Sequence, residues 1–305
     1  MRKLLKIKGR FAIRQKVSSL RQAITSDVMV CSPSLCYRRF AMASVQPVGD
    51  LLREWRQRRR LSQLELSCDA EISTRHLSFL ETGRSQPSRE MVLHLAAQLD
   101  VPLRERNVLL VAAGYAPIFP ERQLADPALE NARKAVDLVL RGHEPYPALA
   151  IDRHWMLVAS NRAVAPLLVG ADASLLHPPV NVLRLSLHPS GLAPRIANLA
   201  EWRSHLLARL YHQIEVTADP VLVELMNELR AYPIPSQRKS AGTSAADRDH
   251  AGVVVPFELI TEWGLLAFFS TTTVFGTPVD ITLSELALEA FFPANSATAE
   301  ALGKM

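Results

Sequence analysis

The chain has 305 residues, of which 48% are hydrophobic and 21% are charged, so it is long enough for two domains with separate cores. This composition excludes an intrinsically disordered or fibrous protein. The longest nearly uncharged run, 108–120, is too short to span a bilayer, and three cysteines do not suit a secreted disulfide framework. We therefore expect a cytoplasmic protein without a membrane segment.

The net charge of +5 is unevenly distributed along the chain. Residues 1–47 carry ten Lys or Arg and one acidic residue, a net charge of +9. Residues 48–305 carry 25 Lys or Arg and 29 acidic residues, a net charge of −4. The basic excess thus lies in a leader at 1–43. We interpret this leader as disordered or as an extension upstream of a later start at Met29 or Met42. An organellar transit peptide and a nucleic-acid-binding arm are the alternatives.

Five short helices are predicted within residues 44–115. Caps and apolar residues at helical spacing place them near 48–60, 63–70, 74–82, 89–99 and 102–113. Ser62 and Glu65 form a capping-box pattern for the second helix. Ser73 caps the third helix, and Gly83 ends it. Two short helices joined by a tight turn can present the second one in a DNA major groove, so we expect an all-α helix-turn-helix domain.

The stretch LSQLELSCDAEISTRHLSFLETGRSQPS at 61–88 resembles the helix-turn-helix of the xenobiotic-response-element family of phage-repressor-like regulators. By this resemblance, Arg56 and Glu81 form a structural pair that ties the first helix to the third. Gln63 is expected to bind a backbone phosphate and to brace the recognition helix. Arg75 is expected to contact guanine O6 and N7, and Phe79 a thymine methyl group. The predicted DNA-binding residues are Gln63, Ser73, Thr74, Arg75, Ser78, Phe79 and Arg84.

The charge of this segment gives weak support to DNA binding. Residues 48–100 carry eight Lys or Arg and eight acidic residues, so their net charge is zero. Phosphate neutralisation supplies much of the affinity for DNA. Clustering of the arginines at 58–60, Arg84 and Arg89 on one side would favour DNA. The alternative is a helix-turn-helix used as a protein-interaction scaffold, with a structural second domain.

Residues 125–302, after a linker at 116–124, are predicted to form an α+β domain. The expected helices are 126–141, 162–168 (capped by Asn161), 181–187, 198–216 and 220–231. The expected strands are 148–151, 155–160, 253–260, 265–274 and 283–292, and the polar segment 233–252 is predicted to be a loop. A strand hairpin, a helical middle and further strands indicate a sheet with helices across one face.

Three stretches of this domain resemble the PAS-like ligand-binding domain of MmyB-like transcription regulators: HEPYPALAIDRHWMLVASN, NVLRLSLHPSGL and FFSTTTVFGTPVDITLSELALEAFFPA. The resemblance implies a bacterial regulator that couples a small, apolar or fatty-acid-like ligand to DNA binding. Arg184, between two leucines, is the charge expected to face an anionic head group, with His188 nearby in sequence. The alternatives are an Arg184 that is exposed or paired with an acid, and a His188 that belongs to a turn.

The sequence contains no recognisable catalytic motif. It contains no HExxH, Walker loop, G-x-S-x-G or GxGxxG sequence, so we expect neither an enzyme nor a cofactor or metal site. An esterase built from His188, Ser190 and a distant Asp is the enzymatic alternative. The expected partners are double-stranded DNA, a small ligand and a second copy of the chain, because a helix-turn-helix dimer reads two half-sites.

Overall fold

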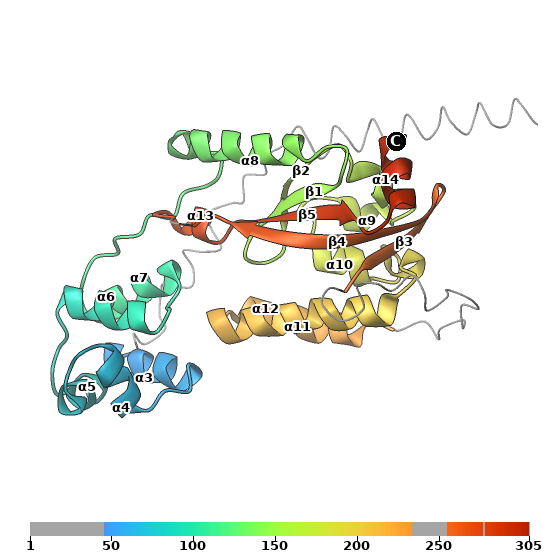
Figure 1. Cartoon of the computed structure of the whole chain (residues 1–305). Coiled ribbons are helices and arrows are strands. Elements are labelled where there is room, and N and C mark those ends of the chain that lie inside the picture. The colour runs from blue at the N-terminus through green and yellow to red at the C-terminus, as the bar shows by residue number, and fades with distance from the viewer. Residues whose placement is uncertain (1–45, 234–254, 277, 305) are drawn as a thin grey trace, which may run out of the picture. The chain divides into compact units, whose positions relative to one another are not determined.

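The computed structural model describes residues 46–233, 255–276 and 278–304. The predicted leader and nearly all of the predicted polar loop therefore lie outside the described residues. Contacts divide the chain into two compact units (Figure 1). The described part of the helical unit is 46–123 with 278–284, and that of the sheet unit is 124–233, 255–276 and 285–304. No helix in the described ranges has both the length and the apolar character of a membrane span.

The helical unit contains the five helices predicted from the sequence. They are α3 (Val48–Arg58), α4 (Gln63–Asp69), α5 (Thr74–Glu81), α6 (Arg89–Gln98) and α7 (Leu103–Ala112). The capping box forms as expected: Ser62 Oγ accepts a hydrogen bond from the Glu65 amide at 3.1 Å, and the Glu65 carboxylate accepts one from the Ser62 amide at 2.7 Å. Local capping thus sets the helix boundaries.

Close packing of α3 on α5 depends on a glycine. A Cβ atom on Gly49 of α3 would lie 2.4 Å from the Leu80 carbonyl oxygen of α5. Leu52 on α3 and Leu77 and Leu80 on α5 are fully buried between the helices. The absence of a side chain at position 49 therefore allows this apolar contact to close.

A segment distant in sequence completes the helical unit. Residues 278–284, which include α13 (Ile281–Ser284), pack with the chain that follows α7. The buried Asp280 carboxylate accepts a hydrogen bond from Arg122 Nη1 at 2.9 Å, and the Ile281 amide donates to the Pro120 carbonyl at 2.9 Å. The predicted strand 283–292 is thus wrong at its start, because Leu283 and Ser284 belong to α13.

The sheet unit is an α+β structure, as predicted. Its strands are β1 (Ala148–Ile151), β2 (Leu157–Ser160), β3 (Phe257–Thr261), β4 (Gly264–Val274) and β5 (Ala287–Pro293). They form one antiparallel sheet in the order β2-β1-β5-β4-β3. Its longer helices are α8 (Glu130–Gly142), α10 (Val182–Leu187), α11 (Leu199–Thr217), α12 (Pro220–Ala231) and α14 (Ser296–Gly303), and α9 (Ala173–Leu176) is a single turn.

Helices cover both faces of this sheet, whereas the sequence predicted one face. Alternation along β1 points Leu149 and Ile151 into the large core that α10, α11 and α12 share. Ala148 and Ala150 point the other way, to a smaller core that includes Val136 of α8. Figure 1 shows α8 on the opposite side of the sheet from α10, α11 and α12.

Asn161 corrects the predicted helix at 162–168. The regular part there is only a 3-10 helix at Ala165–Leu168, and the Asn161 side chain does not cap it. The buried amide instead accepts a hydrogen bond from the Ala148 amide at 3.1 Å and donates to the carbonyls of Leu140 and Tyr146 at 3.1 and 2.7 Å. Asn161 therefore joins β1, the end of α8 and the loop between them.

Candidate DNA interface and ligand-binding cavity

Helix α5 turns its apolar side inward and its polar side outward. Leu77 and Leu80 have no exposed surface, while Arg75 is exposed and Ser78 and Phe79 are half-buried. The spacing of the two leucines accounts for this orientation, since residues three apart lie on one helical face. The predicted base-facing side chains Arg75, Ser78 and Phe79 are thus on a surface that a ligand can reach.

The predicted DNA-binding residues Ser73 and Thr74 have internal partners. Ser73 Oγ accepts a hydrogen bond from the His76 amide at 3.1 Å and so caps α5. The Thr74 hydroxyl lies 2.9 Å from the hydroxyl of Ser67, a buried residue of α4. The Thr74–Ser67 contact thus joins the start of α5 to α4.

Arg56, Gln63 and Glu81 form a buried network that holds α5 in place. Arg56 donates from Nε and Nη2 to the two Glu81 carboxylate oxygens at 2.7 and 2.9 Å, and Gln63 Nε2 donates to Oε2 at 2.8 Å. Burial opposes ionisation of Glu81, but the hydrogen bonds from Arg56 and Gln63, together with the charges of Arg56 and Arg53, outweigh it and lower the pKa of the carboxyl. Arg56 and Glu81 thus make the expected pair, and Gln63 braces α5. Its contact with a DNA phosphate stays a prediction.

Phe79 is flanked by two arginines. The guanidinium carbon of Arg75 lies 5.3 Å from the centroid of the Phe79 ring, and that of Arg84 lies 5.8 Å from it. Both distances suit cation–π attraction, which extends to about 6 Å. The Phe79 ring, which is predicted to contact a thymine methyl group, thus already contacts two cations within the protein.

In the sheet unit, Arg184 is paired with an acid. Its Nε and Nη2 donate to the two oxygens of Glu228 on α12 at 2.8 and 2.7 Å. These hydrogen bonds lower the pKa of the Glu228 carboxyl, which also accepts a hydrogen bond from the Tyr232 hydroxyl at 2.5 Å. The His188 ring meets the Tyr232 ring edge-on at 5.1 Å. The structure thus brings Arg184 and His188 into one cluster with Glu228 and Tyr232.

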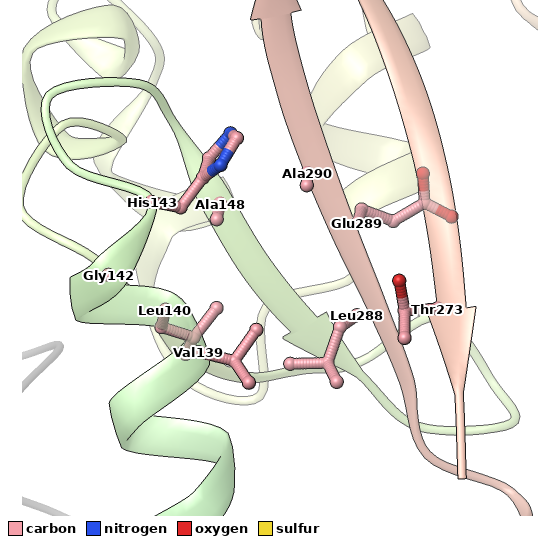
Figure 2. A pocket seen from close by; sticks show the side chains of 9 residues that line it. All are labelled: Val139, Leu140, Gly142, His143, Ala148, Thr273, Leu288, Glu289 and Ala290. Atoms are coloured by element: carbon pink, nitrogen blue, oxygen red, sulfur yellow. The ribbon is translucent and has the colours of Figure 1, made fainter. Parts of the chain in front are cut away.

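A small cavity lies elsewhere in the sheet unit, between the end of α8 and strands β1, β4 and β5 (Figure 2). Its volume is about 160 Å³. The lining is mainly apolar, with the side chains of His143 and Thr273 as polar groups, and comprises Val139, Leu140, Gly142, His143, Ala148, Thr273, Leu288, Glu289 and Ala290. The Glu289 carboxylate is instead bonded to Arg209 and Thr272. Arg184 and His188 are not among the lining residues.

Sequence reasoning missed this cavity. Its most exposed apolar wall is Val139, which has 52% of its surface accessible next to the core residue Leu140. A valine beside the apolar stripe of an amphipathic helix is the one signal that the sequence offered. Apart from Ala148 of β1, the strand walls come from β4 and β5, more than 100 residues away along the chain, so their arrangement follows from the sheet order alone.

Two family comparisons match the chain. Residues 47–109 match a helix-turn-helix domain family, and residues 132–305 match the MmyB-like transcription regulator ligand binding domain. The first match covers α3 to α6 and ends within α7, and the second begins within α8. No group of three or more His, Cys, Asp or Glu side chains within the described residues is placed to hold a metal ion.

Individual relatives are regulators too. An HTH-type transcriptional regulatory protein of Methanoculleus marisnigri is 33% identical over 139 residues, which is 44% of this chain and 42% of the relative. The transcriptional regulator ClgR of Mycobacterium tuberculosis is 37% identical over 75 residues, covering 25% of this chain and 64% of the relative. The HTH-type transcriptional regulator RghRB of Bacillus subtilis is 37% identical over 78 residues, covering 25% of this chain and 54% of the relative. The matched segments thus span less than two thirds of each relative. Because the second family match extends over more than half of the chain, the protein belongs to the family with the MmyB-like transcription regulator ligand binding domain, here preceded by a helix-turn-helix domain.

Proposed function

We propose that the protein is a sequence-specific DNA-binding transcription regulator whose α5 enters a major groove. This proposal is based on the outer face of α5. Arg75 is exposed there, whereas Glu81, the single acidic residue of α5, is only 1% exposed and is paired with Arg56. The surface offered to DNA is therefore cationic, although residues 48–100 have no net charge.

The test is Arg75→Ala in the full chain. A DNA site is first selected from randomised fragments, and the dissociation constant for that site and for scrambled DNA is measured by fluorescence anisotropy. Loss of a bidentate guanine contact costs about 1–3 kcal/mol, so we expect about 5- to 150-fold weaker binding to the selected site and little change for scrambled DNA. Arg162→Ala removes the same charge from an exposed residue of the sheet unit and is the matched control.

Two results would overturn the proposal. If Arg75→Ala and Arg162→Ala weaken binding equally, α5 does not read bases. If the wild-type chain shows no preference between selected and scrambled DNA, the protein-interaction scaffold becomes the better interpretation of the helical unit.

We propose further that the cavity beside α8 binds a small apolar, fatty-acid-like ligand. Val139, Leu140, Leu288 and Ala290 supply apolar walls, and Thr273 adds a hydroxyl among them. A volume of about 160 Å³ holds roughly five groups of the size of a water molecule, at about 30 Å³ each. The cavity therefore suits a short aliphatic chain better than a long one.

A chain-length series tests this ligand class. Hexanoate is expected to raise the melting temperature of the full chain more than palmitate at equal concentration, since a ligand that binds only the folded state stabilises it. Ala290→Leu fills the cavity and is expected to abolish the hexanoate shift. A larger shift with palmitate, or an unchanged shift in the variant, would place the ligand elsewhere.

The ligand role of Arg184 and His188 stays a prediction. A carboxylate ligand at Arg184 would have to replace Glu228, which already holds the guanidinium with two hydrogen bonds. Substituting Arg184→Gln should weaken octanoate binding but not octanol binding if the prediction is correct.

The homodimer is likewise a proposal. It rests on the requirement of helix-turn-helix proteins for two half-sites on one face of DNA. Native mass spectrometry of the full chain with and without the selected DNA tests it. The proposal would be refuted if the selected DNA contained a single half-site and bound one copy of the chain.

A further inference from the structure

We infer that Phe79 is a positioning residue that holds the guanidiniums of Arg75 and Arg84 as a pair, so that each DNA half-site contains two G·C pairs a few base-pair steps apart. This inference rests on the proposed DNA-binding function. It departs from the expectation that Phe79 itself contacts a thymine methyl group.

The local structure brings three residues together that are not neighbours in sequence. Arg75 and Phe79 are one helical turn apart on α5, so their side chains lie on the same face. After the helix, Gly83 has a φ of +70°, which reverses the chain. The amides of Arg84 and Ser85 then donate to the Phe79 carbonyl at 2.9 and 3.2 Å. The turn therefore returns Arg84 to the Phe79 ring.

Both guanidiniums are available to DNA while they contact the ring. Among the described residues, neither arginine pairs with a carboxylate, and both are exposed. A guanidinium has five N–H donors in a planar fork, and contact with an aromatic ring uses none of them. The fork can thus still donate to guanine O6 and N7 in the major groove.

Pre-ordering gives Phe79 its effect on affinity. A free arginine side chain has considerable rotamer entropy, part of which is lost when it binds a base. A cation–π contact with the Phe79 ring is attractive and restricts the arginine side chain before DNA arrives. Because rigid groups lose less entropy on binding, the ring lowers the cost of both guanine contacts together.

The geometry also limits the spacing of the two bases. The guanidinium carbons lie 5.3 and 5.8 Å from one ring centroid, so they are no more than 11.1 Å apart. At about 3.4 Å per base pair, this is about three base-pair steps. Both arginines therefore address one half-site. Two phosphate contacts would instead strengthen binding to all sequences alike.

The experiment selects DNA from a randomised pool with four variants of the full chain and compares the preference at each position. We expect Arg75→Lys to relax one G·C position and Arg84→Lys to relax a second one within three or four steps. Phe79→Leu should relax both by about two- to fivefold, and Phe79→Tyr, which keeps the ring, should retain both. Melting curves of Phe79→Leu verify that the helical unit is folded.

The outcomes separate this inference from the function on which it rests. If the wild-type chain selects a motif but Phe79→Leu weakens all sequences equally, the pairing is refuted and DNA recognition stands. The pairing is also refuted, with DNA recognition intact, if Arg84→Lys changes no base preference. This result comes from a variant in which Phe79 is unchanged. If the wild-type chain selects no motif, both the inference and the proposed function fail.

Discussion

Replacing Glu81 by glutamine should strongly destabilise the helical unit. The Glu81 side chain has no exposed surface, and it accepts hydrogen bonds from Arg56 at 2.7 and 2.9 Å and from Gln63 at 2.8 Å. Arg53 Nε lies 3.6 Å from the same carboxylate. Glu81→Gln keeps the volume of the side chain but removes its charge. It thus leaves the Arg56 guanidinium, which is only 11% exposed, without an ionic partner.

The expected loss follows from this burial. Breaking a buried ion pair by removing one partner costs about 3–5 kcal/mol, because the remaining charge is uncompensated. We expect the lower end, about 3 kcal/mol, since the glutamine carbonyl still accepts one hydrogen bond. A loss of 3 kcal/mol makes the unfolded fraction about 150-fold larger.

Hydrogen exchange of the full chain measures the effect in the helical unit by itself. Amides in α3 and α5 should exchange about 150-fold faster in Glu81→Gln, because their exchange follows unfolding of this unit. Glu90→Gln, at an exposed position in the first turn of α6, is the matched control and should change exchange little. Replacing the pair by Arg56→Met with Glu81→Leu should restore much of the protection. Exchange in Glu81→Gln within fivefold of wild type would refute the assigned role of the network.

Three further predictions concern single groups. Although burial raises it, the pKa of Asp219 is lowered to about 2, chiefly by the hydrogen bond from His154. Because the folded pKa is below the unfolded one, this stabilisation is complete above about pH 4, and about 2 kcal/mol is lost as the pH falls to about 2. Denaturant titrations of the wild type and Asp219→Asn at pH 5 and pH 2.5 should show this loss in the wild type alone. Gly49→Ala should cost about 1–3 kcal/mol in denaturant unfolding, since its Cβ would meet a carbonyl oxygen at 2.4 Å, whereas Gly303→Ala, with open space around it, should cost almost nothing. Asn161→Ala should cost about 3 kcal/mol and lower the melting temperature, because it leaves three buried backbone groups without the side chain that bonds them; a loss below 1 kcal/mol would contradict this.

The helical unit was predictable because its signals are local. Ser62, Ser73 and Ser88 each bond an amide three residues on, so the pattern that marks a helix start lies within one turn of sequence. The Arg56–Glu81 pair spans 25 residues and followed from family resemblance. The contacts of Arg75 and Arg84 with Phe79 were not predicted, because they depend on the turn at Gly83.

The sheet unit was predictable in its elements but not in its site. Strands and long helices show clear periodicity, and most were placed within a few residues. The pairing of Arg184 with Glu228 joins residues 44 positions apart, and nothing near Arg184 in sequence identifies its partner among the acids of the chain. Asn161 looked like a helix cap because asparagine is typical there. Its buried amide instead satisfies backbone groups that only the folded structure brings together.

The segment at 278–284 changes what an excised DNA-binding fragment would be. A fragment cut after residue 123 keeps Arg122 and the Pro120 carbonyl but loses the Asp280 carboxylate and the Ile281 amide that bond them. It also lacks the Ile281 side chain, which is buried in the intact chain. Such a fragment is an incomplete folding unit, and its stability would not represent that of the same unit in the intact chain. The shortest faithful version of this unit needs a second piece of chain, supplied as a peptide or joined through an engineered loop.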